Sequence, residues 1–182
     1  MKKILSLFIL LIFIYGCSNS VDESLQTTTK NTNDGKAPIW FDIVLDDVNT
    51  DEKYTISSFL GKPILVESFA VWCPTCTTQQ NIIKDLHNEV GNSIVSISIN
   101  TDSNEDSGVI ISHTQTHGFK WRYSVSPIEL TRSLIDEFGV SIVNAPSVPM
   151  ILICPNGDYY KLKNGIKQKD EILSEIETKC NA

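Results

Sequence analysis

Short apolar runs alternate along the chain with longer segments of helical periodicity. Runs of alternating or β-branched apolar residues predict strands. They lie at residues 39–45, 64–69, 93–99, 121–125, 150–154 and 159–162. Apolar positions spaced three and four apart predict helices from the Cys73–Cys76 motif to Val90, and at 108–117, 128–138 and 168–179. Residues 54–60 are expected to form a short helical turn or a loop.

The run at 64–69 is the most apolar of the predicted strands and follows Pro63, so we expect it to be a buried central strand. Gly91 and Gly139 stand where glycine commonly closes a helix. Residues 155–158 predict a hairpin turn. Strands that alternate with helices and end in a hairpin and a helix predict an α/β fold, a central mixed β-sheet flanked by helices on both faces.

The composition is that of a globular protein with an acidic surface. The length of 182 residues favours one domain with short appendages. Hydrophobic residues make up 41% and charged residues 20%, which is ordinary for a chain with a proper core. The formal net charge is −7. Because a nucleic-acid binder usually has a basic face, we expect no nucleic acid among the partners.

The first residues have the parts of an export signal. Lys2 and Lys3 precede an apolar run from Ile4 to Tyr15. At about a dozen residues this run is too short for an ordinary membrane-spanning helix, which needs roughly 20. A positive start followed by a short apolar core is typical of a signal peptide.

Gly16-Cys17, which follows this core, resembles the lipobox of lipoproteins, in which cleavage precedes the cysteine and a lipid is attached to its sulfur. An uncleaved short anchor and secretion with a free Cys17 are the alternatives. Residues 18–36 are mostly polar and bury too little apolar surface to fold. We therefore expect an extracytoplasmic protein held on the cell membrane through the Cys17 lipid. Its parts would be a signal peptide at 1–16, a flexible tether at 17–37 and a folded domain at 38–182.

The motif that carries chemistry is Trp72-Cys73-Pro74-Thr75-Cys76, directly after the predicted central strand. Two cysteines spaced in this way at the start of a helix can form a disulfide and separate again. A helix N-terminus favours a thiolate, and proline fits the first helical turn because its missing N–H would have no partner there. We therefore expect Cys73 to be the exposed attacking thiol and Cys76 the buried resolving thiol. No cofactor beyond this redox-active disulfide is expected.

Residues 66–76 resemble the strand, tryptophan and dithiol of thioredoxins. Residues 56–63 resemble the lead-in of the TlpA-like, extracytoplasmic branch of that family. Four later motifs follow in the order of that branch: His117-Gly118-Phe119, Glu137-Phe138-Gly139-Val140, Val148-Pro149-Met150 and Asn156-Gly157-Asp158. The resemblance covers about residues 39–180. It implies a thioredoxin-like fold with an N-terminal extension and a central α/β insertion.

The same resemblance implies a thiol–disulfide oxidoreductase that acts on extracytoplasmic protein disulfides as a reductant. Its partners would be protein thiol and disulfide substrates, with a membrane thiol reductase as electron donor. Thioredoxins usually carry proline where this chain has Thr75, and Pro74-Thr75 is similar to glutaredoxin-like dipeptides. This difference leaves the direction of electron flow open between reductant, oxidant and isomerase.

Val148-Pro149 resembles the cis-proline loop of the family, which implies that it faces the dithiol and that the backbone of Val148 pairs with a substrate chain. Pro146 competes for this position, since Ala145-Pro146 also precedes the strand. Two ordinary loop prolines are the remaining alternative. Trp72, Pro74, Thr75 and Val148 are the expected substrate-binding residues, with core packing as the alternative for Trp72.

Glu67 interrupts the predicted central strand, six residues before Cys73. Burial of an unpaired carboxylate is costly and usually raises its pKa. Many thioredoxins carry a buried acid at this position. By resemblance, Glu67 would accept the proton of Cys76 when that thiol attacks. A strand-edge glutamate that reaches solvent is the alternative.

The other two cysteines of the domain are Cys154 and Cys180, at the ends of a predicted strand and the last predicted helix. In a thioredoxin-like layout both ends point away from the active site, so a structural disulfide between them is one hypothesis, favoured by an oxidising compartment. Two unpaired thiols are the alternative. Zinc is not expected, because the two cysteine pairs would lie at opposite ends of the domain.

A Cu(I)-binding metallochaperone is the main alternative function, because two thiolates suit Cu(I). Copper carriers on this fold usually space the cysteines one residue wider and add a distant histidine. The histidines of this chain are His87, His113 and His117, which are expected to be ordinary surface residues.

Overall fold

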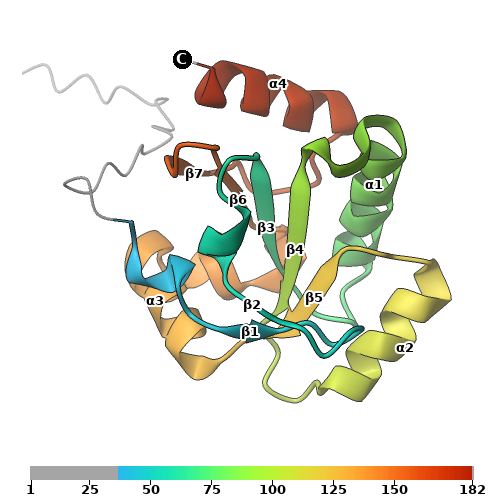
Figure 1. Cartoon of the computed structure of the whole chain (residues 1–182). Coiled ribbons are helices and arrows are strands. Elements are labelled where there is room, and N and C mark those ends of the chain that lie inside the picture. Colours follow the sequence, from blue (N-terminus) through green and yellow to red (C-terminus); the bar gives the residue numbers. More distant parts are fainter. Residues whose placement is uncertain (1–36, 182) are drawn as a thin grey trace, which may run out of the picture.

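The computed structural model describes residues 37–181. Its centre is a five-stranded sheet in the order β5-β4-β3-β6-β7 (Figure 1). The strands are β3 (Ile64–Phe69), β4 (Val95–Asn100), β5 (Arg122–Val125), β6 (Met150–Ile153) and β7 (Tyr159–Lys161). β3 is parallel to β4 and antiparallel to β6, so the sheet is mixed as predicted.

Four helices cover the sheet: α1 (Pro74–Val90), α2 (Ser107–His117), α3 (Ile128–Phe138) and α4 (Lys169–Cys180). Ile83, Leu86 and Ile172 of α1 and α4 pack with Leu65 on one face of the sheet. Leu130 and Leu134 of α3 pack on the opposite face, in a separate cluster. The α2–β5 unit stands between β4 and α3 in the chain, near its centre. The predicted fold class is therefore confirmed.

β3 is the centre of the fold. All six of its residues are buried, because helices cover both faces of the sheet at this strand. The predicted bounds of β3 and α3 are confirmed, and α1 extends to Val90 as expected. Gly91 and Gly139 follow the last residues of α1 and α3, each with positive φ. The short turn at 54–60 is the 3₁₀ helix Ile56–Phe59.

The strand predicted at 39–45 is wrong. Ile39–Phe41 forms a 3₁₀ helix, and only Leu45–Asp46 is a strand (β1), paired with Lys53–Tyr54 (β2). Trp40 and Phe41 are adjacent in sequence and both buried, and both contact the ring of Tyr159 edge-on. A strand would point adjacent side chains to opposite faces, whereas a helical turn allows both to enter the same cluster.

The signal peptide, Cys17 and nearly all of the tether lie outside the described residues. Among the helices that the structure describes, none combines the length and apolar character needed to cross a membrane.

A disulfide joins Cys154, after β6, to Cys180 at the end of α4, which decides between the two alternatives for this pair. Cys154 is fully buried, and the pair is separated by 26 residues in sequence. The bond attaches the last helix to the sheet.

Removal of this cross-link should destabilise the oxidised protein. Because the closed loop restricts the unfolded chain, Cys180→Ser should lower the free energy of unfolding by about 3 kcal/mol. Guanidinium unfolding of both proteins measures the difference. With both proteins reduced by dithiothreitol the difference should largely vanish, which is the internal control. Equal stability under oxidising conditions would contradict a closed disulfide.

Candidate active site

The dithiol lies where β3 ends and α1 begins, at the carboxyl edge of the parallel strands. Cys73 is the N-cap of α1, and its sulfur accepts a hydrogen bond from the backbone N–H of Cys76 at 3.2 Å. Pro74 occupies the first turn of the helix. The two cysteines form a disulfide, with their Cα atoms 5.3 Å apart. The helix N-terminus thus directs an N–H group at the sulfur of Cys73, which favours a thiolate.

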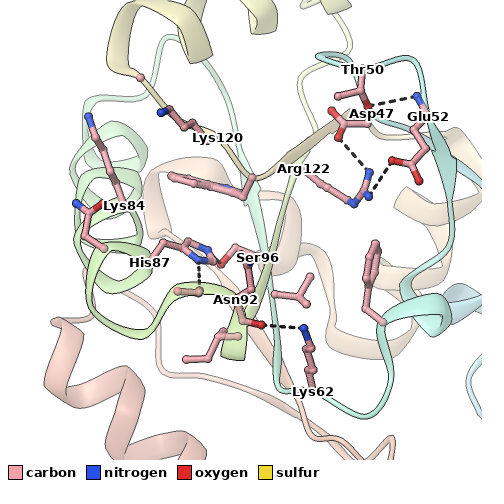
Figure 2. A pocket seen from close by; sticks show the side chains of 17 residues that line it. Asp47, Thr50, Glu52, Lys62, Lys84, His87, Asn92, Ser96, Lys120 and Arg122 are labelled. Carbon is pink, nitrogen blue, oxygen red and sulfur yellow. Dashed lines mark hydrogen bonds and ion pairs between the residues drawn. The ribbon is translucent and has the colours of Figure 1, made fainter.

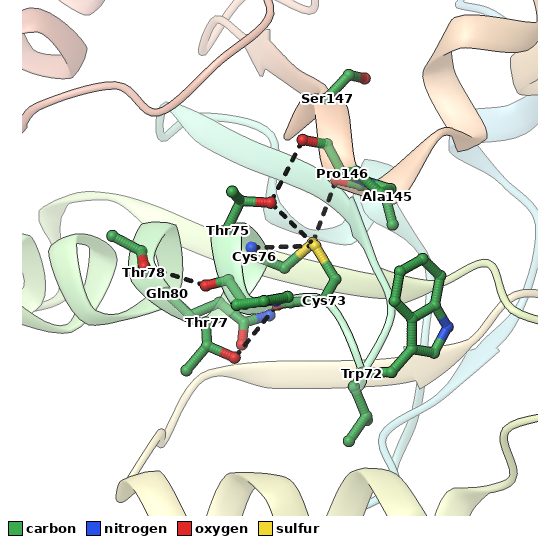
Figure 3. The surroundings of a disulfide bond; sticks show 12 residues. Trp72, Cys73, Thr75, Cys76, Thr77, Thr78, Gln80, Ala145, Pro146 and Ser147 are labelled. Atoms are coloured by element: carbon green, nitrogen blue, oxygen red, sulfur yellow. Dashed lines mark hydrogen bonds between the residues drawn. A yellow bond between two sulfur atoms is a disulfide. The ribbon is translucent and has the colours of Figure 1, made fainter.

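Both cysteines are covered in this disulfide form. Cys73 and Cys76 are each only 1% exposed, so the expectation of an exposed Cys73 is wrong here. The cover is the 3₁₀ turn Ala145–Ser147, which lies beside the disulfide (Figure 3). The Ala145 carbonyl oxygen lies 3.2 Å from the Cys76 sulfur, and the Thr75 hydroxyl donates to the Pro146 carbonyl at 3.3 Å. The Cys73 sulfur must therefore become more exposed before a partner can reach it.

Val148 does not take the position expected for it. The described residues contain no cis peptide bond, so Val148–Pro149 is trans. The Val148 N–H donates to the Ala145 carbonyl, and its own carbonyl accepts from the buried Lys167 ammonium at 2.8 Å. Both backbone groups are engaged within the protein, and the left-handed conformation of Val148 (φ 48°) turns the chain into β6. Pro146, the competing proline, is the one whose turn contacts the dithiol helix.

Two carboxylates hold the segment before Cys73. Glu105 accepts hydrogen bonds from the backbone N–H groups of Val71 and Trp72, at 2.8 and 3.3 Å, and from the Asn100 amide at 2.5 Å. Asp102 accepts the Trp72 indole N–H at 2.5 Å, and the backbone N–H of Asn104, followed by this indole, holds the pKa of Asp102 below its ordinary value. Trp72 is still 59% exposed, which argues against simple core packing. The loop after β4 therefore orients Trp72 beside the dithiol.

Glu67 is buried in β3, with 2% of its surface exposed. Its Oε1 accepts from the Ser98 hydroxyl of β4 at 2.5 Å and from the Gln80 amide of α1 at 2.9 Å. Burial raises its pKa from 4.5 to about 7, although both hydrogen bonds and the charge of Lys167 act in the opposite direction. The alternative of a solvent-reaching glutamate is excluded.

Gln80 connects this acid to two helices. It lies one turn beyond Cys76 on α1, and its Oε1 accepts from His113 Nε2 of α2 at 2.7 Å. Burial, and then the charge of His117, lower the pKa of His113 to about 4, so the ring is neutral near pH 7. Glu67 therefore contacts the helix that carries the dithiol through Gln80, one turn after Cys76.

A groove of about 660 Å³ lies at the opposite end of the sheet, beside the start of β4 (Figure 2). Its lining includes Lys84, His87, Trp121 and Arg122, and no cysteine. Arg122 is paired with Asp47 and Glu52. No group of three or more potential metal ligands occurs among the described side chains. His113 and His117 lie together, with ring centroids 4.8 Å apart, while His87 stacks on Trp121.

The comparison with known protein families decides the class of this site. The model of the Redoxin family matches residues 19–170, most of the chain. The chain belongs to the Redoxin family. A redoxin with a Cys-x-x-Cys pair at the start of α1 is a thiol–disulfide oxidoreductase. No curated protein matches this redoxin.

Solved structures show the same fold. A thiol:disulfide interchange protein of the thioredoxin family from Chlorobium tepidum is 17% identical, with a TM-score of 0.56, covering 75% of this chain and 91% of the other. A secreted Mycobacterium tuberculosis disulfide oxidoreductase, homologous to E. coli DsbE, is 14% identical, with a TM-score of 0.56 and coverage of 75% and 95%. BsSco, of the Sco family of cytochrome c oxidase assembly proteins, is 18% identical, with a TM-score of 0.60 and coverage of 79% and 95%. These likenesses establish the thioredoxin-like fold of the redoxin.

Several contributors to the site were not predicted from the sequence, namely Gln80, Ser98, Asp102, Glu105 and Lys167. The loop that carries Asp102 and Glu105 follows a strand parallel to β3. Because carboxyl ends of parallel strands meet at one edge of a sheet, its acids could have been placed near Cys73. Lys167 lies in the segment before α4, and nothing in the local pattern indicates its burial.

The raised pKa of Glu67 predicts a pH-dependent stability. The folded state binds this proton more tightly than the unfolded chain does. The stability that the protonated carboxyl contributes is therefore fully present below pH 4.5 and is lost as the pH rises through about 7. The free energy of unfolding of Glu67→Gln does not depend on this proton, so between pH 4.5 and 8 it should rise by about 3 kcal/mol relative to that of the parent protein.

Denaturant unfolding at several pH values measures this difference. His113 is present in both proteins, so the comparison isolates Glu67. The exposed Glu177→Gln is the matched control and should show no such trend. A difference between Glu67→Gln and the parent that stays constant with pH would rule out the raised pKa.

Glu105 should stabilise the segment before Cys73. Glu105→Ala leaves two backbone N–H groups and the Asn100 amide without this acceptor, which should cost about 1–3 kcal/mol of unfolding free energy. Hydrogen exchange of the Val71 and Trp72 amides should accelerate. Glu105→Gln keeps an acceptor oxygen and should have a smaller effect on both measurements. Unchanged exchange in Glu105→Ala would refute the role.

Proposed function

We propose that this redoxin is a lipid-anchored, extracytoplasmic reductant of protein disulfides. Cys73 is the attacking thiol, and Cys76 resolves the mixed disulfide. The observation that carries the proposal is the position of Cys73 as N-cap of α1, where the Cys76 N–H meets its sulfur at 3.2 Å. A sulfur in that position gains most as a thiolate, the form that attacks disulfides.

The reaction transfers two electrons from the dithiol to the substrate. The Cys73 thiolate attacks one sulfur of the substrate disulfide, a Cys73–substrate bond forms, and the other substrate sulfur leaves as a thiolate. Cys76 then loses its proton and attacks the Cys73 sulfur, which releases the second substrate thiolate and closes the Cys73–Cys76 disulfide. Glu67 accepts the proton of Cys76, through a rearrangement of the side chains around Gln80. A membrane thiol reductase returns the electrons.

The reductive direction is supported by the charges around Cys73. Glu105 binds the N–H of Trp72, the residue directly before Cys73, and Asp102 binds its indole. Negative charges near a thiolate disfavour it, which stabilises the disulfide form and makes the dithiol a better reductant. The Cys154–Cys180 disulfide supports an oxidising compartment, in line with an export signal at 1–16 and a lipid on Cys17.

A trapping experiment tests the function. Cys76→Ser leaves Cys73 to attack but removes the resolving thiol, so mixed disulfides with extracytoplasmic proteins should accumulate. Cys73→Ser is the matched control and should capture none. Insulin reduction by the parent protein measures the activity directly. No capture by Cys76→Ser, together with no insulin reduction by the parent, would reject the proposal.

A Cu(I) carrier is the competing function. BsSco shares the fold, and two thiolates suit Cu(I). Titration of the reduced protein with Cu(I) distinguishes the two functions. Stoichiometric Cu(I) retention without disulfide-reductase activity would favour the Cu(I) carrier over the reductase.

A further inference from the structure

Thr75 lies between the dithiol and its cover. Its hydroxyl oxygen is 3.2 Å from the Cys73 sulfur and 3.3 Å from the carbonyl oxygen of Pro146 (Figure 3). A hydroxyl has one proton, so Thr75 can donate to only one of these two acceptors at a time. The choice between them depends on which is the better acceptor.

In the disulfide form the better acceptor is the carbonyl, because the sulfur of a disulfide is a weak acceptor. Thr75 then donates to Pro146 and attaches α1 to the turn Ala145–Ser147, whose Ala145 is buried in the same cluster as both cysteines. Reduction reverses the preference. A Cys73 thiolate is charged, and hydrogen bonds to ionised acceptors are about twice as strong as neutral ones.

We propose that Thr75 is a positioning residue whose hydroxyl donates to Pro146 while the disulfide is closed and to the Cys73 thiolate once it is reduced. In the disulfide form the Thr75 hydroxyl therefore holds the Ala145–Ser147 turn against α1. In the reduced form it is a second hydrogen-bond donor to the thiolate, beside the Cys76 N–H. Reduction releases the cover at the time when Cys73 must meet a substrate. The inference rests on the proposed function only in taking Cys73 as the attacking thiol.

Two variants separate the hydroxyl from the shape of the side chain. Thr75→Val keeps the shape and removes the hydroxyl, whereas Thr75→Ser keeps the hydroxyl. Thr78→Val is the matched control, because Thr78 is an exposed threonine of the same helix whose hydroxyl donates only to the Pro74 carbonyl.

The first measurement is the pKa of Cys73, from the pH dependence of iodoacetamide alkylation in a Cys76→Ser background. Thr75→Val should raise this pKa by about 1 unit through loss of a donor to the thiolate. The second is the rate at which dithiothreitol reduces the Cys73–Cys76 disulfide in the otherwise unchanged protein. Thr75→Val should react several-fold faster, because the cover is no longer held.

Thr75→Ser and Thr78→Val should match the parent in both measurements. A change in only one of the two for Thr75→Val, no change in either, or the same changes in Thr75→Ser would overturn the inference. Neither measurement uses a protein substrate, so a failure of the proposed reductase function would leave both results interpretable.

Discussion

The hydrogen bond from the Cys76 N–H to the Cys73 sulfur is the interaction on which the site depends. It caps α1 and, at the same time, directs the positive end of the helix at the reactive atom. The packing of α1 on the sheet through Ile83 and Leu86 fixes where this helix begins. A shift of the helix start by one residue would move both sulfur atoms away from the Ala145–Ser147 turn. The chemistry therefore depends on the packing of α1 as much as on the cysteines themselves.

Hydrogen-bond donors contact the Cys73 sulfur, and two acids hold the residue next to it. The Cys76 N–H and, in our inference, the Thr75 hydroxyl favour the thiolate. Glu105 and Asp102 lie on the other side, next to Trp72, and disfavour it. A reductant needs a thiolate that forms near neutral pH and a disulfide that is nevertheless the more stable form. In the proposed reductant, short-range donors and more distant acids together meet both needs, since the donors act on the sulfur directly while the acids act through space.

The sequence predicted those parts of the fold that depend on local pattern. β3, α1 and α3 were found because a continuous apolar run, an N-terminal dithiol and a closing glycine are local signals. The segment at 39–45 was assigned wrongly because Trp40 and Phe41 pack on Tyr159, more than a hundred residues away. The same holds for the site. Cys73, Cys76 and Glu67 were predicted from their positions along one strand and helix, whereas the bonds of Val148 depend on Lys167, which no local pattern brings to it.

In our proposal, the polar residues under α1 link proton uptake to redox chemistry. Glu67, Ser98, Gln80 and His113 form a hydrogen-bonded chain in a region that an apolar core would fill more cheaply. The Tyr123 hydroxyl is buried in the same region without a hydrogen-bond partner in the described part of the chain, which adds to the cost. Gln80 contacts Glu67 and belongs to the helix that carries Cys76. If a protonated Glu67 stabilises a Cys76 thiolate, thermodynamic linkage requires that the thiolate raise the proton affinity of Glu67 by the same free energy. With a Glu67 pKa of about 7, this coupling operates at neutral pH, where a carboxylate with an ordinary pKa would be a weaker base and would hold an accepted proton poorly.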